Sequence, residues 1–307
     1  MLRRHLLLGA LAAPQETPRA YAERLSRVYG QEITDIVYTQ TFALIGRWRL
    51  GQRGEVKRIL HPWLSGERDS LAKPTASHYS GHLAMADIPE GRALVERAAA
   101  MAAADPKDNE MSDSVFMVCP LLARAGNYDG ALAHFRKMEK LCLRPDGIYR
   151  HSPLCEAAWG RGNGFPMLGL ALALSEIPAR HPASVEMLGA FRKLAAALKP
   201  HQDKDGMWHQ VIDAPESFAE FSSTAMIATA MHRGVKRGWL RKGDFAQAVS
   251  KAWSGVRAHT TAEGDVLDVC ESTGKLKTLD EYLRRKAIRG RDPRGGSMAL
   301  LFATELL

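Results

Sequence analysis

The chain has 307 residues, of which 46% are hydrophobic, and a formal net charge of +8. That hydrophobic content suffices for a large core and excludes wholesale disorder, although the length would allow one domain or two. Lys and Arg residues are scattered among acids rather than gathered on one helix. The charge therefore disfavours nucleic-acid binding and fits an acidic, sugar-like ligand.

The first residues, MLRRHLLLGALAAPQ, combine a basic start, a short apolar run and small residues, a pattern typical of a signal peptide. Pro14 and Pro18 argue against the alternative, an ordinary first helix. The apolar run is too short to span a bilayer. We expect an export signal in residues 1–13, a periplasmic or secreted protein without stable membrane association, and a single domain in residues 14–307.

Four cysteines show no CxxC spacing, which disfavours a zinc site: Cys119, Cys142, Cys155 and Cys270. A chain of this length does not need disulfides, so we expect free, partly buried thiols. The sequence implies neither a metal ion nor an organic cofactor.

Apolar residues recur at helical spacing along most of the chain, and long alternating strands are absent. The predicted helices are 18–29, 37–50, 90–104, 111–125, 128–142, 164–176, 184–199, 219–234, 243–259 and 293–305. Helix 164–176 is apolar nearly all round, whereas helix 128–142 is amphipathic. Fully apolar helices are buried on several sides and amphipathic helices face water, so this alternation predicts an inner ring of helices wrapped by an outer ring.

Three segments, PDGIYRH, KDGMWHQ and AEGDVLDV, each place an acid and a glycine before a short β-like run. Their glycines, Gly147, Gly206 and Gly264, follow one another at intervals of 59 and 58 residues, and each interval holds about two helices. The alternative is that such turns are simply common. Their near-equal spacing predicts repeated helical hairpins, about six in a chain of this length. We predict an all-α fold, an (α/α)6 toroid whose loops gather around a cleft at one end.

Side chains suited to a saccharide pocket gather on these loops: Tyr149, His151, Trp159, Arg161, Asn163, Phe165, Trp208 and His209. Aromatic rings stack on the apolar faces of sugars, arginine pairs with carboxylates, and histidine and asparagine bond hydroxyl groups. Each residue alone could be structural, but their recurrence favours a site for an acidic saccharide. The glycines of WGRGNGF lack the spacing of a nucleotide loop, and we expect them to let the backbone turn tightly and approach a ligand.

Asp113 is the candidate acid, at the start of an apolar helix that continues with Val115, Phe116 and Met117. Acids are favoured at helix N-termini for electrostatic reasons, so a structural role is the alternative. Burial favours the protonated form of a carboxyl group, whereas a helix N-terminus favours the ionised form. A catalytic acid at this position requires the effect of burial to dominate.

Three segments together resemble the unsaturated glucuronyl and rhamnogalacturonyl hydrolases, glycoside hydrolase families 88 and 105: WGRGNGF with the helix after it, DSVFMVCPLLARAG, and DGMWHQVIDAPESFAEFSSTAMIATAM. VLDVCESTG and GGSMALLFATELL fit as well, so the resemblance covers most of the chain from about residue 20. It implies an α/α six-hairpin toroid and a glycosidase that removes a 4,5-unsaturated uronic acid from the non-reducing end of lyase-generated oligosaccharides. The implied reaction protonates C4 of the double bond and adds water at C5.

The resemblance also implies roles for individual residues. Asp113 matches the proton donor, Trp159 the sugar-stacking tryptophan and Arg161 the substrate-binding arginine, while Phe165 replaces a tryptophan often found there. The expected substrate-binding residues are Tyr38, His82, His151, Trp159, Arg161, Asn163, Phe165, Trp208 and His209. The expected partners are an unsaturated uronyl oligosaccharide and water.

One departure concerns residues 76–88, ASHYSGHLAMADI, where members of these families often carry a further Asp. Asp87 lies late in this stretch and is not assigned, while His78, Tyr79 and His82 occupy the expected neighbourhood. The departure is compatible with altered specificity, a different supporting network or loss of activity. The alternatives are therefore a related lyase or ordinary glycosidase, a non-catalytic saccharide-binding toroid, or a helical interaction scaffold. The sequence names neither the linked sugar nor the oligomeric state.

Overall fold

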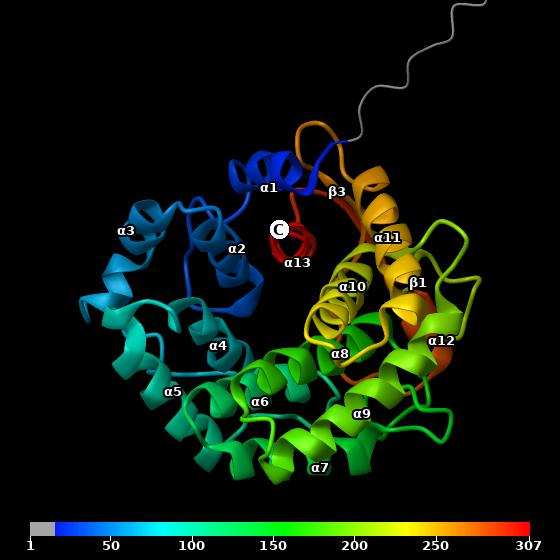
Figure 1. The fold of residues 1–307 in the computed structure, drawn as a ribbon, viewed down its shortest axis with the longest axis horizontal. Helices are drawn as coiled ribbons and strands as arrows, with labels where there is room; N and C mark the ends of the chain where they lie inside the picture. The colour runs from blue at the N-terminus through cyan, green and yellow to red at the C-terminus, as the bar shows by residue number, and fades with distance from the viewer. Residues whose placement is uncertain (1–15) are drawn as a thin grey trace, which may run out of the picture.

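The computed structural model describes residues 16–307, so the expected signal segment 1–13 lies outside the described residues. The helices of residues 16–307 form two concentric rings (Figure 1). The inner ring comprises α2 (Tyr38–Arg49), α4 (Ala76–Gly81), α6 (Ser114–Arg124), α8 (Gly160–Glu176), α10 (Phe221–Lys236) and α13 (Pro293–Glu305). The outer ring comprises α1 (Pro18–Ser26), α3 (Arg53–Leu64), α5 (Arg92–Ala104), α7 (Tyr128–Cys142), α9 (Pro182–Leu198) and α11 (Lys242–Ala258).

Outer and inner helices alternate along the chain, and each inner helix packs against the next around the ring. The ring closes where α13 packs against α2, near the start of the described chain. This arrangement confirms the predicted (α/α)6 toroid. The helices α6 and α7 show how the sequence produces this arrangement. The residues of the inner helix α6 from Ser114 to Ala123 are all buried, whereas the outer helix α7 keeps an exposed polar face.

Two helices in the first part of the chain were not predicted. Helix α3 contains Pro62 and begins beside Gly54, both unfavourable inside a helix. Helix α4 is only six residues long, and its polar sequence, ASHYSG, carries no apolar stripe. Both helices complete hairpins of the ring, so packing against neighbours decides their conformation rather than intrinsic propensity.

Short irregular elements connect the rings. The described part of the chain contains two antiparallel strand pairs, β1 (Trp208–His209) with β2 (Ala219–Glu220), and β3 (Val266–Cys270) with β4 (Ala287–Gly290). The remaining elements are α12 (Leu279–Leu283) and the 3₁₀ turns η1 (His82–Met85), η2 (Pro89–Gly91) and η3 (Lys199–His201). The strands precede or flank the first turns of α10 and α13.

The three repeated glycines adopt one conformation. Gly147, Gly206 and Gly264 have φ angles of 89°, 89° and 88°, in the left-handed region that favours glycine. Each glycine N–H donates to the carbonyl oxygen three residues earlier, so the three turns share a hydrogen bond as well. Each turn follows an outer helix and leads toward an inner one, which confirms the predicted repeat of hairpins.

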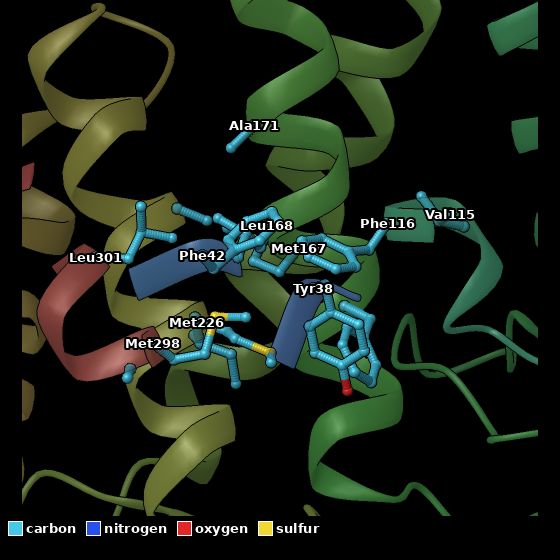
Figure 2. Close-up of a cluster of buried hydrophobic side chains, with 14 of the residues drawn as sticks. Tyr38, Phe42, Val115, Phe116, Met167, Leu168, Ala171, Met226, Met298 and Leu301 are labelled. Atoms are coloured by element: carbon cyan, nitrogen blue, oxygen red, sulfur yellow. The ribbon is translucent and has the colours of Figure 1, made fainter. Parts of the chain in front are cut away.

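The centre of the ring is filled with apolar side chains from the inner helices (Figure 2). Phe116 of α6 lies 5.4 Å from Tyr38 and 5.1 Å from Phe42 of α2, between ring centroids. Met226 of α10 and Met298 of α13 pack in the same cluster and are completely buried. Because these side chains fill the middle of the ring, a ligand site within the inner ring lies toward one of its ends.

The segment WGRGNGF forms the first turns of α8, which begins at Gly160 with Trp159 as its N-cap residue. A Cβ atom at Gly160 would lie 2.6 Å from the carbonyl oxygen of His209, so only glycine lets the helix approach β1 this closely. The Gly160 N–H also donates to the carbonyl oxygen of Gln210 at 2.7 Å. The expectation of a tight turn beside a ligand is thus corrected: at Gly160 the close approach is between two protein segments.

All four cysteines are unpaired, as expected; Cys119, Cys142 and Cys270 are buried and Cys155 is half-buried. Within residues 16–307, none of the helices combines the length and the apolar character needed to cross a membrane.

Candidate active site

A pocket with a volume of about 270 Å³ opens at the end of the ring where the inner helices begin. Residues from the first turns of five of these helices line it: Tyr38 and Thr39 of α2, Ala76 and Ser77 of α4, Ser114 of α6, Arg161 of α8 and Arg294 of α13. Helix N-termini carry unpaired N–H groups and partial positive charge. Their convergence favours an anionic ligand in this pocket.

Asp113 lines the pocket as the N-cap residue of α6, but its side chain makes no capping hydrogen bond. Asp113 therefore does not cap the helix by a hydrogen bond, whereas a purely electrostatic interaction with the helix terminus needs no such bond. Asp113 Oδ1 is buried without a hydrogen-bond partner among residues 16–307, while the side chain as a whole is 14% exposed. The carboxyl group thus has one oxygen enclosed in the protein, while part of the side chain is exposed and lines the pocket.

His151 lies behind Asp113 rather than in the wall of the pocket, and it is completely buried. Its Nε2 is 3.3 Å from Asp113 Oδ1, close enough for an ion pair but not aligned for a hydrogen bond. Its Nδ1 lies 2.9 Å from the hydroxyl oxygen of Tyr282. The expectation that His151 binds substrate directly is corrected, because its side chain is completely buried and does not line the pocket.

Three aromatic side chains predicted to bind substrate do line the pocket: Tyr38, Trp159 and Phe165. Tyr38 and Phe165 meet edge to face, with centroids 5.5 Å apart, where the apolar centre of the ring borders the pocket. Burial raises the pKa of Tyr38 to about 12, so its hydroxyl group keeps its proton at neutral pH. Together the rings form an apolar wall of the kind that sugars stack against.

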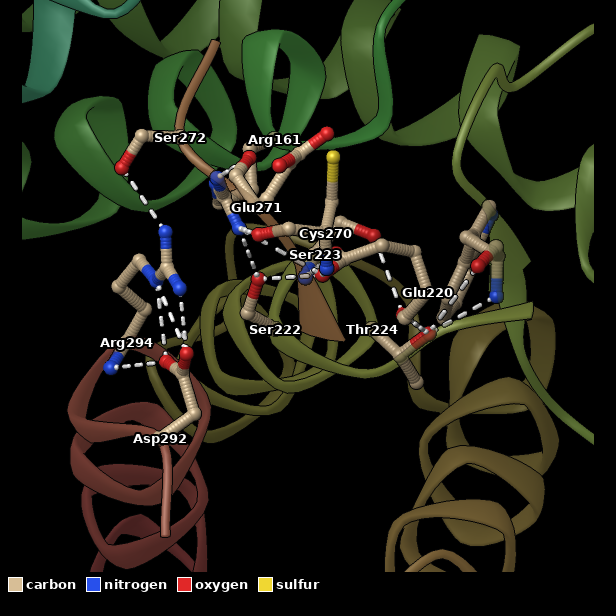
Figure 3. A network of polar contacts seen from close by, with 11 residues as sticks. Arg161, Glu220, Ser222, Ser223, Thr224, Cys270, Glu271, Ser272, Asp292 and Arg294 are labelled. Atoms are coloured by element: carbon tan, nitrogen blue, oxygen red, sulfur yellow. Dashed lines mark hydrogen bonds and ion pairs between the residues drawn. The ribbon is translucent and has the colours of Figure 1, made fainter. Parts of the chain in front are cut away.

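Arg161 lines the pocket from a buried position and is held by the protein on several sides (Figure 3). Its Nη1 donates to the carbonyl oxygen of Cys270 at 2.6 Å, and its Nη2 to that of Glu271 at 2.9 Å. Glu220 Oε1 lies 3.7 Å from Nη1, and the guanidinium carbon lies 4.8 Å from the Trp159 ring centroid. The expected two-pronged pairing of Arg161 with a ligand is corrected in this structure. Both Nη atoms of the guanidinium group are already bonded to backbone carbonyl oxygens at the end of β3, so Arg161 contributes mainly positive charge to the pocket.

Arg294 is a second pocket cation that the sequence did not reveal (Figure 3). Its Nη1 donates to Ser272 Oγ at 2.8 Å, and its Nε donates to Asp292 Oδ1 at 3.0 Å. Ser272 and Thr273, in the segment after β3, line the same wall. The sequence did contain a signal for this wall: Ser272 and Thr273 belong to VLDVCESTG, a segment that fits the family resemblance but in which no site residue was predicted.

The segment before α6 forms another unpredicted wall of the pocket, through Lys107, Asp108, Asn109 and Met111. Lys107, Asn109 and Glu110 have φ angles of 53°, 49° and 56°, uncommon for residues other than glycine. Asp108 is bonded to Lys137 Nζ at 2.6 Å and accepts from the Glu110 N–H at 2.9 Å. Asp108 is therefore a partnered carboxylate, unlike Asp113.

Other predicted site residues lie outside the pocket wall. Asn163 is completely buried, and its amide bonds both the N–H and the carbonyl oxygen of Tyr149, at 2.7 and 2.8 Å. Trp208 is also completely buried and donates from Nε1 to the carbonyl oxygen of Leu198. His209 is bonded to Ser217 and Asp203. These three calls are corrected: the side chains hold the loops that carry the pocket.

His82 is likewise corrected, because it is completely buried between Ser70 Oγ, at 2.9 Å, and the carbonyl oxygen of His78, at 2.7 Å. The pocket wall near this segment is formed by the uncharged Ala76 and Ser77. Asp87 does not line the pocket and pairs with Arg124 at the C-terminal end of α6.

The pocket thus combines one carboxyl group without a hydrogen-bond partner, an aromatic wall and the cations Lys107, Arg161 and Arg294. Such a set can bind an anionic, partly apolar ring and transfer a proton to it.

Comparisons with known proteins show what this chain is similar to. The model of Glycosyl Hydrolase Family 88 matches residues 97–307. An unsaturated rhamnogalacturonyl hydrolase of Bacillus subtilis is 28% identical over 212 residues, 65% of this chain and 59% of that protein. An unsaturated 3S-rhamnoglycuronyl hydrolase of Alteromonas sp. is 30% identical over 154 residues, 48% of this chain and 35% of that protein. The chain therefore spans less than two thirds of these relatives.

A similar solved structure is a possible member of glycoside hydrolase family 105 from Klebsiella pneumoniae, with a TM-score of 0.82 and 20% identity. The match covers 100% of this chain and 95% of the other. At that identity the likeness supports the fold alone.

Proposed function

Because the chain belongs to glycosyl hydrolase family 88, we propose that it removes a 4,5-unsaturated uronic acid from the non-reducing end of lyase-generated oligosaccharides. The observation that carries the proposal is Asp113, whose Oδ1 is buried and lacks a hydrogen-bond partner among residues 16–307. This carboxyl group lines a pocket with aromatic rings, arginines and converging helix N-termini. A general acid therefore stands beside a place suited to a sugar carboxylate.

In the proposed reaction, Asp113 delivers a proton to C4 of the double bond, and positive charge develops at C5 beside the ring oxygen. Water adds at C5 and returns a proton to the Asp113 carboxylate. The resulting hemiketal opens, and the neighbouring sugar is released. One carboxyl group thus serves as acid and then as base, whereas ordinary glycosidases place a carboxylate on each side of the scissile bond. Acid–base catalysis of this kind contributes about 10²–10⁴-fold.

Arg161 and Arg294 are the proposed sources of positive charge for the uronate carboxylate. Backbone carbonyls of Cys270 and Glu271 fix the first guanidinium group, and Asp292 fixes the second. Side chains that are already immobilised lose little rotational freedom when a ligand binds. Trp159 is the proposed stacking surface beside them.

A second candidate is a saccharide-binding protein that lacks turnover. It is favoured by Ala76 and Ser77, which present no carboxylate to the pocket where relatives often carry another Asp. Asp108 does not replace that group as a free acid, because Lys137 and the Glu110 N–H occupy it. The two candidates share the ligand and differ in whether Asp113 acts alone.

The deciding experiment follows the ultraviolet absorbance of the unsaturated uronyl group in a panel of lyase-derived disaccharides. Wild-type protein is expected to abolish the absorbance of at least one member, and Asp113→Asn to lose this activity by about 10²-fold or more. Calorimetry on the same panel detects binding without turnover, which would support the second candidate. Absence of both binding and turnover across the panel would overturn the proposed substrate class.

We also propose export of the protein, on the pattern of residues 1–13. Mass spectrometry of the protein recovered from the periplasm or medium should show a mature chain that has lost this segment. Recovery of the intact N-terminus from the cytoplasm would contradict it.

A further inference from the structure

Tyr282 is completely buried in α12, a short helix between β3 and β4, and it does not line the pocket. Its hydroxyl oxygen lies 2.9 Å from Nδ1 of His151, on the side of the imidazole away from Asp113. We propose that Tyr282 is a positioning residue that fixes the tautomer of His151 and thereby directs the reactive oxygen of Asp113. The inference rests on the proposed role of Asp113 as the acid.

The contacts of the Tyr282 hydroxyl group bear on the direction of its hydrogen bond to His151. The N–H of Leu276 donates to the hydroxyl oxygen at 3.3 Å, so the oxygen already serves as an acceptor. Burial raises the pKa of Tyr282 to about 12, and the hydroxyl group therefore keeps its proton at neutral pH. We assign this proton to the 2.9 Å contact with Nδ1 of His151, which makes Nδ1 the unprotonated nitrogen of a neutral imidazole.

The tautomer follows from this assignment. With Nδ1 as acceptor, the imidazole proton is on Nε2, which lies 3.3 Å from Asp113 Oδ1. When Oδ1 carries no proton, the opposite tautomer would point the Nε2 lone pair at this oxygen, and two acceptors at that distance repel each other. Tyr282 and Asp113 therefore favour the same tautomer from opposite sides of the ring.

The His151 ring has little room to reorient. Its centroid lies 4.5 Å from the Trp159 ring and 5.7 Å from the Tyr282 ring. The backbone is held as well, since the His151 N–H donates to the carbonyl oxygen of Ala157 and its carbonyl oxygen accepts from the Ser112 N–H, next to Asp113. Imidazole and carboxyl group are thus parts of one rigid unit.

A second contact connects Tyr282 to the WHQ stretch of this sequence, whose Trp208 and His209 do not line the pocket. Gln210 is completely buried, and its Nε2 donates to the carbonyl oxygen of Tyr282 at 2.8 Å. The Gln210 carbonyl oxygen in turn accepts from the Gly160 N–H at 2.7 Å. Gln210 therefore joins the start of α8, which carries Arg161, to the residue that orients His151.

The two carboxyl oxygens of Asp113 therefore have different roles. Oδ1 lies 3.3 Å from Nε2 of His151, although the two atoms are not aligned for a hydrogen bond in this structure. On this inference the transferable proton of the acid is on Oδ2, the other oxygen of the carboxyl group. Hydrogen bonds at active sites are often poorly aligned without a ligand, and a small rotation of the carboxyl group completes the contact.

The test compares Tyr282→Phe with Tyr21→Phe, a control that also removes one buried hydroxyl group, bonded to Thr260 at 2.8 Å and unconnected to the pocket. Nitrogen-15 NMR of histidine-labelled protein reports the tautomer, and loss of one signal in His151→Gln assigns it. Wild-type protein and the control should show His151 protonated at Nε2 with Nδ1 hydrogen-bonded. In Tyr282→Phe the Nδ1 signal should move to that of a free nitrogen.

In the absorbance assay, Tyr282→Phe should lower kcat by roughly 10- to 100-fold, as loss of a partner that orients a histidine does elsewhere. KM should change little, because Tyr282 does not touch the ligand pocket. A wild-type His151 protonated at Nδ1, or an unchanged kcat in Tyr282→Phe, would overturn the inference. The NMR measurement needs no substrate, so inactivity of the wild-type protein on every disaccharide would count against the proposed function alone.

Discussion

Arg161 Nη1 lies 3.7 Å from Glu220 Oε1, and both side chains are buried at the edge of the pocket. Glu220 also accepts hydrogen bonds from the Ser222 hydroxyl group and from the N–H groups of Ser223 and Cys270. The carboxylate therefore holds the arginine, the first turn of α10 and the end of β3 together. Stability and ligand binding depend on the same buried charge.

Replacement Glu220→Gln should strongly destabilise the protein. The amide places an NH₂ group against one of the N–H donors and leaves the charge of Arg161 without its carboxylate, and breaking a buried pair costs about 3–5 kcal/mol. Urea unfolding measures the loss. The matched control is Glu96→Gln, which breaks the exposed pair with Arg92 and should change the unfolding free energy by less than about 1 kcal/mol. Equal effects of the two replacements would contradict the buried ion pair.

Trp159 and Trp208 should respond differently to replacement by leucine. Trp159 lines the pocket, so Trp159→Leu should weaken disaccharide binding by about tenfold, the value of one stacking contact. Trp208 is buried away from the pocket and bonds the Leu198 carbonyl oxygen, so Trp208→Leu should lower the melting temperature and leave the Kd of the folded protein near the wild-type value. Calorimetry and thermal unfolding distinguish the two results; weakened binding in both variants would argue against this placement of the site.

Two glycines in helices should give opposite results when changed to alanine. At Gly160 the added methyl group would lie 2.6 Å from the His209 carbonyl oxygen, and the overpacking should cost about 1–3 kcal/mol. At Gly189, in α9, no atom lies within 4 Å of the added group, and alanine should stabilise the helix by about 0.5–1 kcal/mol. Thermal unfolding measures both; a stabilised Gly160→Ala would show that α8 and β1 are not in close contact.

The protein should become less stable as the pH is lowered, because of two buried histidines. Burial lowers the pKa of His82 to about 4, and that of His134 also to about 4, from 6.5. As the pH falls from about 6.5 to 4, these two histidines therefore bind protons in the unfolded chain but not in the folded chain. The unfolding free energy should be highest above this range and decrease within it, by about 1–3 kcal/mol for each histidine.

Urea unfolding at several pH values between 7 and 4.5 measures this dependence. His82→Gln keeps polar groups for Ser70 and for the His78 carbonyl oxygen but cannot titrate. It should flatten the curve, and a double replacement that adds His134→Gln should flatten it further. A curve that is unchanged in both variants would show that neither histidine is responsible.

The ring could be predicted from sequence because its cause is local. A helix such as α8 is apolar on all sides, and the glycines at 147, 206 and 264 need the left-handed backbone wherever the turn recurs. Helices α3 and α4 escaped prediction because Pro62, Gly54 and the shortness of α4 remove the local signal. Their conformation is decided by neighbours in the ring.

The pocket was predicted only in part, because the sequence does not show in which direction each side chain points. The sequence correctly brought Asp113, Trp159, Arg161 and Phe165 together, but it could not show that Asn163 turns into the loop it supports. On a loop that feeds a buried helix, polar side chains have as many partners inside the protein as in the pocket. Arg294 and Lys107 were missed because only closure of the ring brings such distant segments together.

Closure of the ring by α13 against α2 has a consequence for the order of folding. Until α13 has left the ribosome, the inner face of α2 has no neighbour on one side, and the apolar side chains that α13 contributes to the centre of the ring are missing. The arc made of the earlier hairpins exposes an apolar edge until then, which is a hazard for association between nascent chains. Closure of the ring is therefore expected to wait for α13 and to be limited by one late, long-range contact.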